Sequence, residues 1–397
     1  MKDMILSAAF FVALLILVQG STAQWTIPPN APLLTKWAKE VSPTNALPEY
    51  PRPQMVRDEW MNLNGLWQYR EAKENEEPPF GEKLPGTILV PYPIESALSG
   101  VMKTTERLWY RRTATMPKKW EGQRVVLHFG AVDWETKVFV NGKAVGQHRG
   151  GYDPFSFDIT DALKPEGEQE IVVGVYDPSD GGDQPRGKQV LKPSGIWYTP
   201  TTGIWQTVWL EPVAPEHVSA MVLVPDVDSE AIRLTVLSTG KSARCAVRVE
   251  VRDGTTQIAD AGGRIGTEIS IPIKSPKLWS PDAPFLYDLT ISLLENGKQI
   301  DVVKSYFGMR KIEIARDDHG VNRILLNGKF VMQVGPLDQG FWPDGIYTAP
   351  TDEALRYDIE MTKTLGFNMA RKHVKVEPDR WYYWADKLGL LVWQDMP

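Results

Sequence analysis

The feature that most constrains the fold is the last stretch of the chain, residues 366–397. A short apolar run ends at the charged Arg371, an amphipathic segment follows, and a second apolar run ends near Asp395. Residues 377–379 (Glu-Pro-Asp) suit the first turn of a helix, because proline fits there and acids favour its positive end. Gly389 is placed to end that helix. The pattern predicts two parallel strands joined by a helix, with polar side chains at the C-terminal end of each strand.

Parallel strands joined by helices are the unit of a (β/α)₈ TIM barrel, whose chemistry takes place at the C-terminal rim. We therefore predict that residues 310–397 begin such a barrel. Residues 330–334 are predicted to be its first strand and residues 335–342 its first rim loop, with Thr351 capping the helix that follows. Because a full barrel takes about 250 residues, we expect this one to be incomplete.

Length and charge narrow the class of protein. The 397 residues are enough for two to four domains. The net charge of −6, with both signs interspersed, gives no electrostatic footprint for nucleic acid. The 15 tryptophans are unusual, and each is interpreted first as a core residue, although tryptophan also stacks on sugars.

The first 23 residues resemble a targeting segment. Lys2 precedes an apolar run at residues 4–18, and small residues follow at positions 21–23. This pattern predicts a cleaved signal peptide, a secreted or periplasmic protein, and no stable membrane span after cleavage. An uncleaved anchor is the alternative. Cys245, the one cysteine, has no second cysteine for an internal disulfide, and its alternation with valines predicts a core position on a strand.

The middle of the chain is predicted to be mainly β. Residues 24–54 are rich in proline and predict an extended arm that packs over a later domain. Residues 55–213 contain alternating runs and an Asn-Gly hairpin signal at residues 141–142, which favour a jelly roll or sandwich. Residues 214–309 also alternate, and their length suits an immunoglobulin-like sandwich. Further Asn-Gly turns are predicted at residues 296–297 and 327–328.

Several motifs then occur in a recognisable order. They are Trp109-Tyr110-Arg111-Arg112, Asp133-Trp134-Glu135-Thr136, Asn141-Gly142-Lys143, His148-Arg149-Gly150-Gly151-Tyr152-Asp153-Pro154 and Gly203-Ile204-Trp205-Gln206-Thr207-Val208. In this combination the chain resembles the N-terminal sugar-binding domain of glycoside hydrolase family 2, which includes β-galactosidases, β-glucuronidases and β-mannosidases. Trp279-Ser280-Pro281 and Phe307-Gly308-Met309 resemble that family's sandwich and its exit into the barrel. The resemblance implies hydrolysis of O-glycosidic bonds of β-linked sugars with retention.

Retaining hydrolysis needs two carboxyl groups about 5 Å apart. The resemblance implies that both catalytic glutamates lie beyond Pro397, so we assign no catalytic residue and expect this chain alone to be inactive. The acids Glu353, Glu360 and Glu377 are predicted to be surface or helix-capping residues.

Part of a substrate-binding rim is nevertheless expected. The resemblance implies substrate-side roles for Arg371, His373 and Asp395, with Asp338 and Trp342 as weaker candidates. The alternative for Arg371 is a structural ion pair. The alternative for His373 is a solvated position in a loop. The family pattern is Arg-x-x-His-Tyr, whereas this chain has Arg371-Lys372-His373, which puts the identity of the sugar in doubt.

Other chemistries find little support. The sequence has no Gly-x-Ser-x-Gly elbow, phosphate-cradling loop or His-Glu-x-x-His pair, so no cofactor and no metal is predicted. Asp177, Asp180 and Asp183 offer oxygen ligands, but their spacing matches no EF-hand loop. Two other functions stay open. One is a non-catalytic carbohydrate-binding protein that uses the aromatic loop at residues 196–198, and the other is a structural surface protein. The sequence does not define an oligomeric state.

Overall fold

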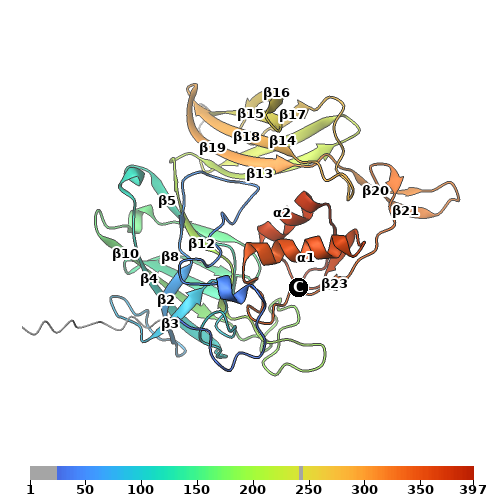
Figure 1. The fold of residues 1–397 in the computed structure, drawn as a ribbon. Helices are drawn as coiled ribbons and strands as arrows, with labels where there is room; N and C mark the ends of the chain where they lie inside the picture. The colour runs from blue at the N-terminus through green and yellow to red at the C-terminus, as the bar shows by residue number, and fades with distance from the viewer. Residues whose placement is uncertain (1–24, 241–244) are drawn as a thin grey trace, which may run out of the picture.

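The computed structural model describes residues 25–240 and 245–397, so the predicted signal segment at residues 1–23 lies outside the described residues. Figure 1 shows a β-sandwich above a larger β domain, with α1, α2 and β23 beside them. Within the described ranges, no helix combines the length and the apolar character needed to cross a membrane.

The larger β domain is a jelly roll of two antiparallel sheets. Its four-stranded sheet has the order β1 (Met61–Asn62), β12 (Val208–Val213), β5 (Arg124–Phe129) and β9 (Phe155–Asp158). Its six-stranded sheet has the order β3 (Gly86–Val90), β2 (Gly65–Glu71), β4 (Arg107–Thr115), β10 (Glu168–Tyr176), β7 (Glu135–Val140) and β8 (Lys143–Arg149). A short pair, β6 (Val132–Asp133) and β11 (Gly203–Ile204), joins its loops. Apolar side chains from both sheets, among them Trp67, Leu127 and Val173, form one buried core.

The second domain is an immunoglobulin-like sandwich, with seven strands among its described residues. One sheet contains β13 (Val218–Asp226), β14 (Ala231–Ser238) and β17 (Glu268–Pro272), and the other contains β16 (Thr256–Arg264), β15 (Cys245–Asp253), β18 (Tyr287–Glu295) and β19 (Lys298–Phe307). Alternate residues of β15 are buried, and Cys245 is one of them, which confirms its predicted core position.

Three Asn-Gly pairs form the predicted hairpin turns. At Asn141-Gly142, Asn296-Gly297 and Asn327-Gly328, both residues have positive φ, between 49° and 81°. This backbone matches the twist of two-residue hairpins, and glycine and asparagine adopt it with little strain. The turns join β7 to β8, β18 to β19, and β21 (Asn322–Leu326) to β22 (Lys329–Phe330).

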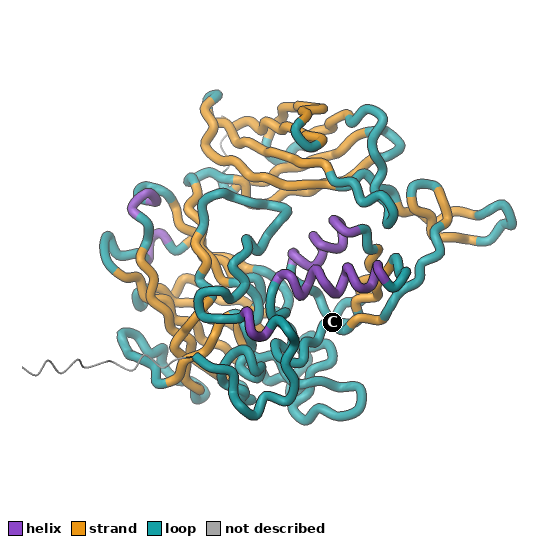
Figure 2. The backbone as a smooth tube through the Cα atoms, in the orientation of Figure 1, coloured by secondary structure: helices purple, strands orange, loops and turns teal. Residues whose placement is uncertain are grey.

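The C-terminal part is the start of a (β/α)₈ barrel. Strands β23 (Leu337–Asp338), β24 (Met369–Lys372) and β25 (Leu391–Gln394) are parallel neighbours. Helix α1 (Asp352–Thr364) joins the first two strands, α2 (Asp379–Leu388) joins the last two, and Figure 2 shows the helices side by side. The Thr351 side chain accepts a hydrogen bond from the Ala354 amide, and Gly389 ends α2 in the left-handed conformation, as the sequence predicts.

The predicted first strand at residues 330–334 is wrong. The Asn-Gly turn makes β22 the third strand of an antiparallel unit with β20 (Ile312–Arg316) and β21, which projects from the molecule in Figure 1. Phe330, Met332 and Val334 are all exposed, whereas the first parallel strand is β23. The rim loop therefore begins after Asp338 rather than at residue 335.

The proline-rich arm packs on both later parts, as predicted. The Trp25 indole donates to the carbonyl of Leu98 in the jelly roll. Trp37 is buried with residues of α1 and α2, and the Thr35 hydroxyl donates to Asp344 at 2.7 Å. Near the end of the arm, Arg52 pairs with the fully buried Glu211 of β12. The arm therefore fixes the jelly roll against the barrel strands.

Candidate functional site

The two faces of the parallel sheet have different environments. The strand register places Leu337, Arg371 and Trp393 side by side, and all three are exposed. Asp338, Lys372 and Gln394 form the next row, on the side where the helices pack. Because successive side chains of a strand point to opposite faces, adjacent residues of β24 serve different surroundings.

On the exposed face, Arg371 and Asp395 form a paired ion bridge across neighbouring strands. The Arg371 Nη2 and Nε atoms lie 2.9 and 3.3 Å from the two carboxylate oxygens of Asp395. His373 lies beside them, with Nε2 3.9 Å from Asp395 Oδ2. Its Nδ1 is buried and has no hydrogen-bond partner among the described residues. Three of the five predicted substrate residues are thus brought together.

On the helix side, Lys372 lies at the centre of a buried ion cluster. Only 1% of its side chain is exposed, and its Nζ lies 2.6 Å from Asp338 Oδ2 and 2.8 Å from Glu377 Oε1. Burial by itself lowers the pKa of Lys372, but the two carboxylates outweigh it and the pKa is raised. Burial works to raise the pKa of Asp338, and the Lys372 charge outweighs it in the other direction.

A second buried lysine joins the same cluster. Lys375 is fully buried, with Nζ 3.0 Å from Glu377 Oε2 and donating to the carbonyls of Gly340 and Tyr347. Burial lowers the pKa of Lys375 to about 8. The cluster therefore ties the loop after β24 to the loop after β23.

The prediction that Glu377 is a surface or capping residue is wrong. Its side chain is 2% exposed, and the N-cap of α2 is Pro378 without a side-chain hydrogen bond. The carboxylate instead compensates two buried lysines. The physical reason is that an uncompensated ammonium group in this interior is far costlier than an unfilled helix cap.

The two weaker candidates lie away from the Arg371 face. Asp338 accepts from the Gly340 amide at 2.8 Å and pairs with Lys372, so its carboxylate is used within the cluster. Trp342 packs edge-on against Trp37 of the arm, with ring centroids 6.1 Å apart. These contacts show that both residues stabilise the packing of neighbouring segments. Their roles in substrate binding stay predictions.

Sequence reasoning missed Lys372, Lys375 and Glu377. A signal was present, because the consecutive basic residues Arg371 and Lys372 cannot both face the same side of a strand. One of them had to be buried under the helices, and a buried lysine requires a carboxylate nearby. The spacing of Lys375 and Glu377 in the following loop did not identify them by itself.

The jelly roll adds an aromatic loop next to the barrel. Tyr198 stacks on Phe341 of the first rim loop, with centroids 4.1 Å apart, and Trp197 is 40% exposed. In the described ranges, no group of three or more His, Cys, Asp or Glu side chains is arranged to hold a metal ion.

Two family descriptions match the chain. Residues 80–210 match "Glycosyl hydrolases family 2, sugar binding domain", and residues 216–310 match "Glycosyl hydrolases family 2". Both matches lie in the two β-sandwich domains.

Relatives with curated names share these regions. A putative β-glucuronidase of Formosa agariphila is 30% identical over 302 residues, covering 73% of this chain and 35% of the relative. A β-galactosidase of Thermoanaerobacter pseudethanolicus is 28% identical, covering 73% of this chain and 39% of that protein. A β-glucuronidase of Bacteroides fragilis is 26% identical, covering 84% and 49%. The chain thus spans between about a third and a half of the length of these three relatives.

Solved structures share the fold. A β-glucuronidase from Ruminococcus gnavus, solved in complex with a glucarolactam, superposes with a TM-score of 0.74 at 20% identity, covering 89% of this chain and 62% of that one. A β-glycosidase from Bacteroides vulgatus gives a TM-score of 0.69 at 23% identity, covering 84% and 44%. Together with the matched domains, these findings show that the chain belongs to glycosyl hydrolases family 2.

Proposed function

We propose that this chain is part of an exported family 2 glycoside hydrolase that cleaves β-linked sugars with retention, and that it supplies one sector of the substrate rim. The observation that carries the proposal is the Arg371–Asp395 bridge with His373 beside it, at the C-terminal ends of β24 and β25. This is the end of a barrel sheet at which chemistry takes place.

Each of the three residues has a role in this proposal. Asp395 holds the Arg371 guanidinium through two contacts, which orients its remaining donors toward the exposed face. The imidazole of His373 lies beside this pair, with Nε2 3.9 Å from Asp395 Oδ2, and an imidazole can exchange a hydrogen bond with a sugar hydroxyl. The sugar is the β-glucuronide or β-galactoside class, because the relatives described above carry those names.

We expect the 397-residue chain to bind sugars at this rim without hydrolysing them. Retention needs two carboxyl groups about 5 Å apart that are available to the substrate. In the described part of the rim, Asp338 and Asp395 lie on opposite faces of the sheet, and both are ion-paired. Neither is free to protonate a leaving group.

The proposal is tested with two assays on the whole chain. Calorimetry with D-glucuronate and with methyl β-D-galactopyranoside should show binding that Arg371→Ala weakens at least tenfold, whereas the surface variant Arg356→Ala should not change it. Incubation with p-nitrophenyl β-D-glucuronide and β-D-galactoside should release no nitrophenol. Sugar affinity that Arg371→Ala does not change would refute the rim assignment. Release of nitrophenol would refute the expectation that this chain binds sugars without hydrolysing them.

A non-catalytic glycan-binding protein is the second candidate. The loop at residues 196–198 favours it, because the Trp197 ring is 40% exposed and is available for stacking on a sugar. Under that function, Trp197→Ala should abolish sugar binding and Arg371→Ala should leave it intact. The two proposals therefore predict opposite results from the same pair of variants.

A further inference from the structure

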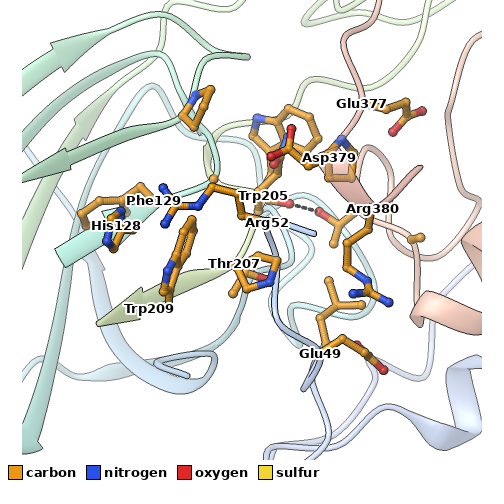
Figure 3. A pocket seen from close by; sticks show the side chains of 18 of the residues that line it. Glu49, Arg52, His128, Phe129, Trp205, Thr207, Trp209, Glu377, Asp379 and Arg380 are labelled. Atoms are coloured by element: carbon orange, nitrogen blue, oxygen red, sulfur yellow. Dashed lines mark hydrogen bonds between the residues drawn. The ribbon is translucent and has the colours of Figure 1, made fainter. Parts of the chain in front are cut away.

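Tertiary contacts restrain charged side chains where the jelly roll meets the barrel part. Figure 3 shows Arg52 and Arg380 at this junction, where Arg52 Nη2 lies 3.1 Å from Glu211 Oε2 and Arg380 Nη2 donates to Asp352 at 2.6 Å. Such contacts limit the positions that a side chain can reach. Where they differ between side chains of the same type and local sequence, they decide which of them can react.

The tripeptide Asn-Gly-Lys provides this comparison, because it occurs three times, at residues 141–143, 296–298 and 327–329. Each copy forms the tip of a hairpin, with φ of 49–52° at asparagine and 74–81° at glycine. A Cβ on the glycine would meet nothing within 4 Å at any of the three turns, so access to the glycine is equal. The contacts of the asparagine side chain are therefore the main difference between the three sites.

The side chain of Asn141 is held by both ends of its amide group. Its Nδ2 donates to the Ala162 carbonyl at 2.9 Å and to Gln169 Oε1 at 2.7 Å, and its Oδ1 accepts from the Glu170 amide at 2.9 Å. Moving the Asn141 Cγ toward the next nitrogen in the chain requires these bonds to break, which is unfavourable.

The side chain of Asn327 is held in the same way. Its Nδ2 donates to the Trp279 carbonyl at 3.0 Å, and its Oδ1 accepts from the Lys311 amide at 2.9 Å. Both partners belong to segments outside the hairpin, so the restraint comes from the tertiary structure and not from the turn.

Asn296 has no such restraint. It is exposed at the tip of the β18–β19 hairpin, and its side chain makes no hydrogen bond to any residue that the structure describes. Exposed loop tips tolerate local rearrangement, because little packs against them. The Asn296 Cγ can therefore approach the Gly297 nitrogen without breaking a contact.

We infer that Asn296 is a site of spontaneous deamidation in the folded protein, and that Asn141 and Asn327 are protected. The Gly297 nitrogen loses its proton and bonds to the Asn296 Cγ. The bond from Cγ to Nδ2 breaks, and Nδ2 takes up a proton and leaves as ammonia. Glycine permits this attack, because it has no side chain to obstruct it.

Water then opens the resulting succinimide ring. Attack at Cγ gives aspartate, and attack at the backbone carbonyl carbon of residue 296 gives isoaspartate. Either product adds one negative charge at the tip of the sandwich domain. The modification is independent of the rim and does not depend on the proposed hydrolysis.

The test needs only the wild-type chain. The whole chain is incubated in mildly alkaline buffer, folded or in urea, and is then digested with trypsin. Each asparagine lies two residues before a lysine, so the three fall in separate peptides, whose amide and acid forms are separated by mass spectrometry. In the folded chain, Asn296 should convert at least tenfold faster than Asn141 and Asn327. In urea the three rates should become similar, which separates the effect of structure from that of the preceding residue.

A pair of variants tests the restraint itself. Asn327→Asp should lower Tm, because a carboxylate cannot donate to the Trp279 carbonyl. Asn296→Asp is the matched substitution without a tertiary partner, so it should lower Tm clearly less. Equal losses of Tm would show that the Asn296 side chain is also restrained.

Two results with the wild-type chain would overturn the inference. One is an absence of conversion at Asn296 in the folded chain over the time in which it reacts in urea, which would mean that the hairpin backbone protects every copy. The other is an equal rate at the three folded sites. Neither result bears on sugar binding or hydrolysis, so the proposed function stands or fails separately.

Discussion

Lys372 and Glu377 are buried together on the helix side of the parallel sheet, with Nζ 2.8 Å from Oε1 and side chains 1% and 2% exposed. Lys372 directly follows Arg371 along β24. A buried pair of this kind is weak evidence for net stability, but removing one partner leaves an uncompensated charge in the interior. The Lys372–Glu377 pair must therefore stay intact for the loops after β23 and β24 to keep their geometry.

We predict that Lys372→Met destabilises the barrel part by about 3–5 kcal/mol, because Asp338 and Glu377 lose their shared partner. The loop at residues 373–378 should gain hydrogen exchange before the jelly roll does. Urea unfolding followed by exchange mass spectrometry measures both effects. Lys387→Met, in the last turn of α2, should change stability by less than about 0.5 kcal/mol. Equal effects of the two variants would contradict the assigned role.

Stability should fall as pH rises across the neutral range. Burial raises the pKa of Glu95 to about 8 and also raises the pKa values of Asp133 and Asp177, which lie near it in the jelly roll. The folded state therefore holds protons that the unfolded chain releases above about pH 4–5. Stability from Glu95 is complete below that pH and is lost up to about pH 8.

The variant Glu95→Gln should flatten this pH dependence. Glutamine keeps an acceptor for the Thr202 amide, which donates to Glu95 Oε2 at 3.0 Å, and it carries no proton to lose. Thermal unfolding at pH 5, 6.5 and 8 should show a smaller drop in Tm for the variant than for the wild type. In the wild type, proton release from Glu95 should lower the unfolding free energy by on the order of 1 kcal/mol for each pH unit. Glu121→Gln, at an exposed site, is the control. A wild-type Tm that rises from pH 5 to 8 would show that this cluster does not dominate.

Gly389→Ala should cost clearly more than Gly366→Ala. Both glycines follow a barrel helix with positive φ, 81° and 89°, so both substitutions carry the roughly 1–2 kcal/mol cost of the left-handed conformation. A Cβ on Gly389 would lie 2.5 Å from the Pro281 carbonyl oxygen, whereas a Cβ on Gly366 meets nothing within 4 Å. The difference in unfolding free energy isolates this contact between α2 and the sandwich domain. If the two variants lose the same unfolding free energy, the loop at Pro281 must move away from the new Cβ without a measurable loss of stability.

Asp386→Ala should loosen the attachment of the sandwich to α2. Its carboxylate accepts from Arg310 at 2.7 Å and from the Tyr306 hydroxyl at 3.2 Å. Losing both partners of a part-buried acid should cost about 1–3 kcal/mol and speed proteolysis near residue 310. Asp386→Asn should recover much of the loss, because its amide oxygen still accepts. The prediction fails if alanine and asparagine behave alike.

Much of the architecture was contained in local sequence signals. Some features depend only on residues close in sequence, and each was found where predicted. They are the three Asn-Gly turns, the Thr351 helix cap and the helix end at Gly389. The rim residues Arg371 and Asp395 could also be placed, because the ends of parallel strands meet at one edge. The first barrel strand was misplaced because an apolar run carries no information about the strand with which it pairs.

What the sequence determined by itself was therefore the order of the domains, their turns and caps, and the strand ends that carry polar groups, since these depend on contacts a few residues apart. Only the tertiary structure decided which of two adjacent basic residues is exposed and that Glu377 compensates two lysines. Lys372 and Glu377 are close in the chain, but their burial depends on packing against distant elements such as the strand that carries Asp338. The free energy of burying a charge depends on everything that packs around it.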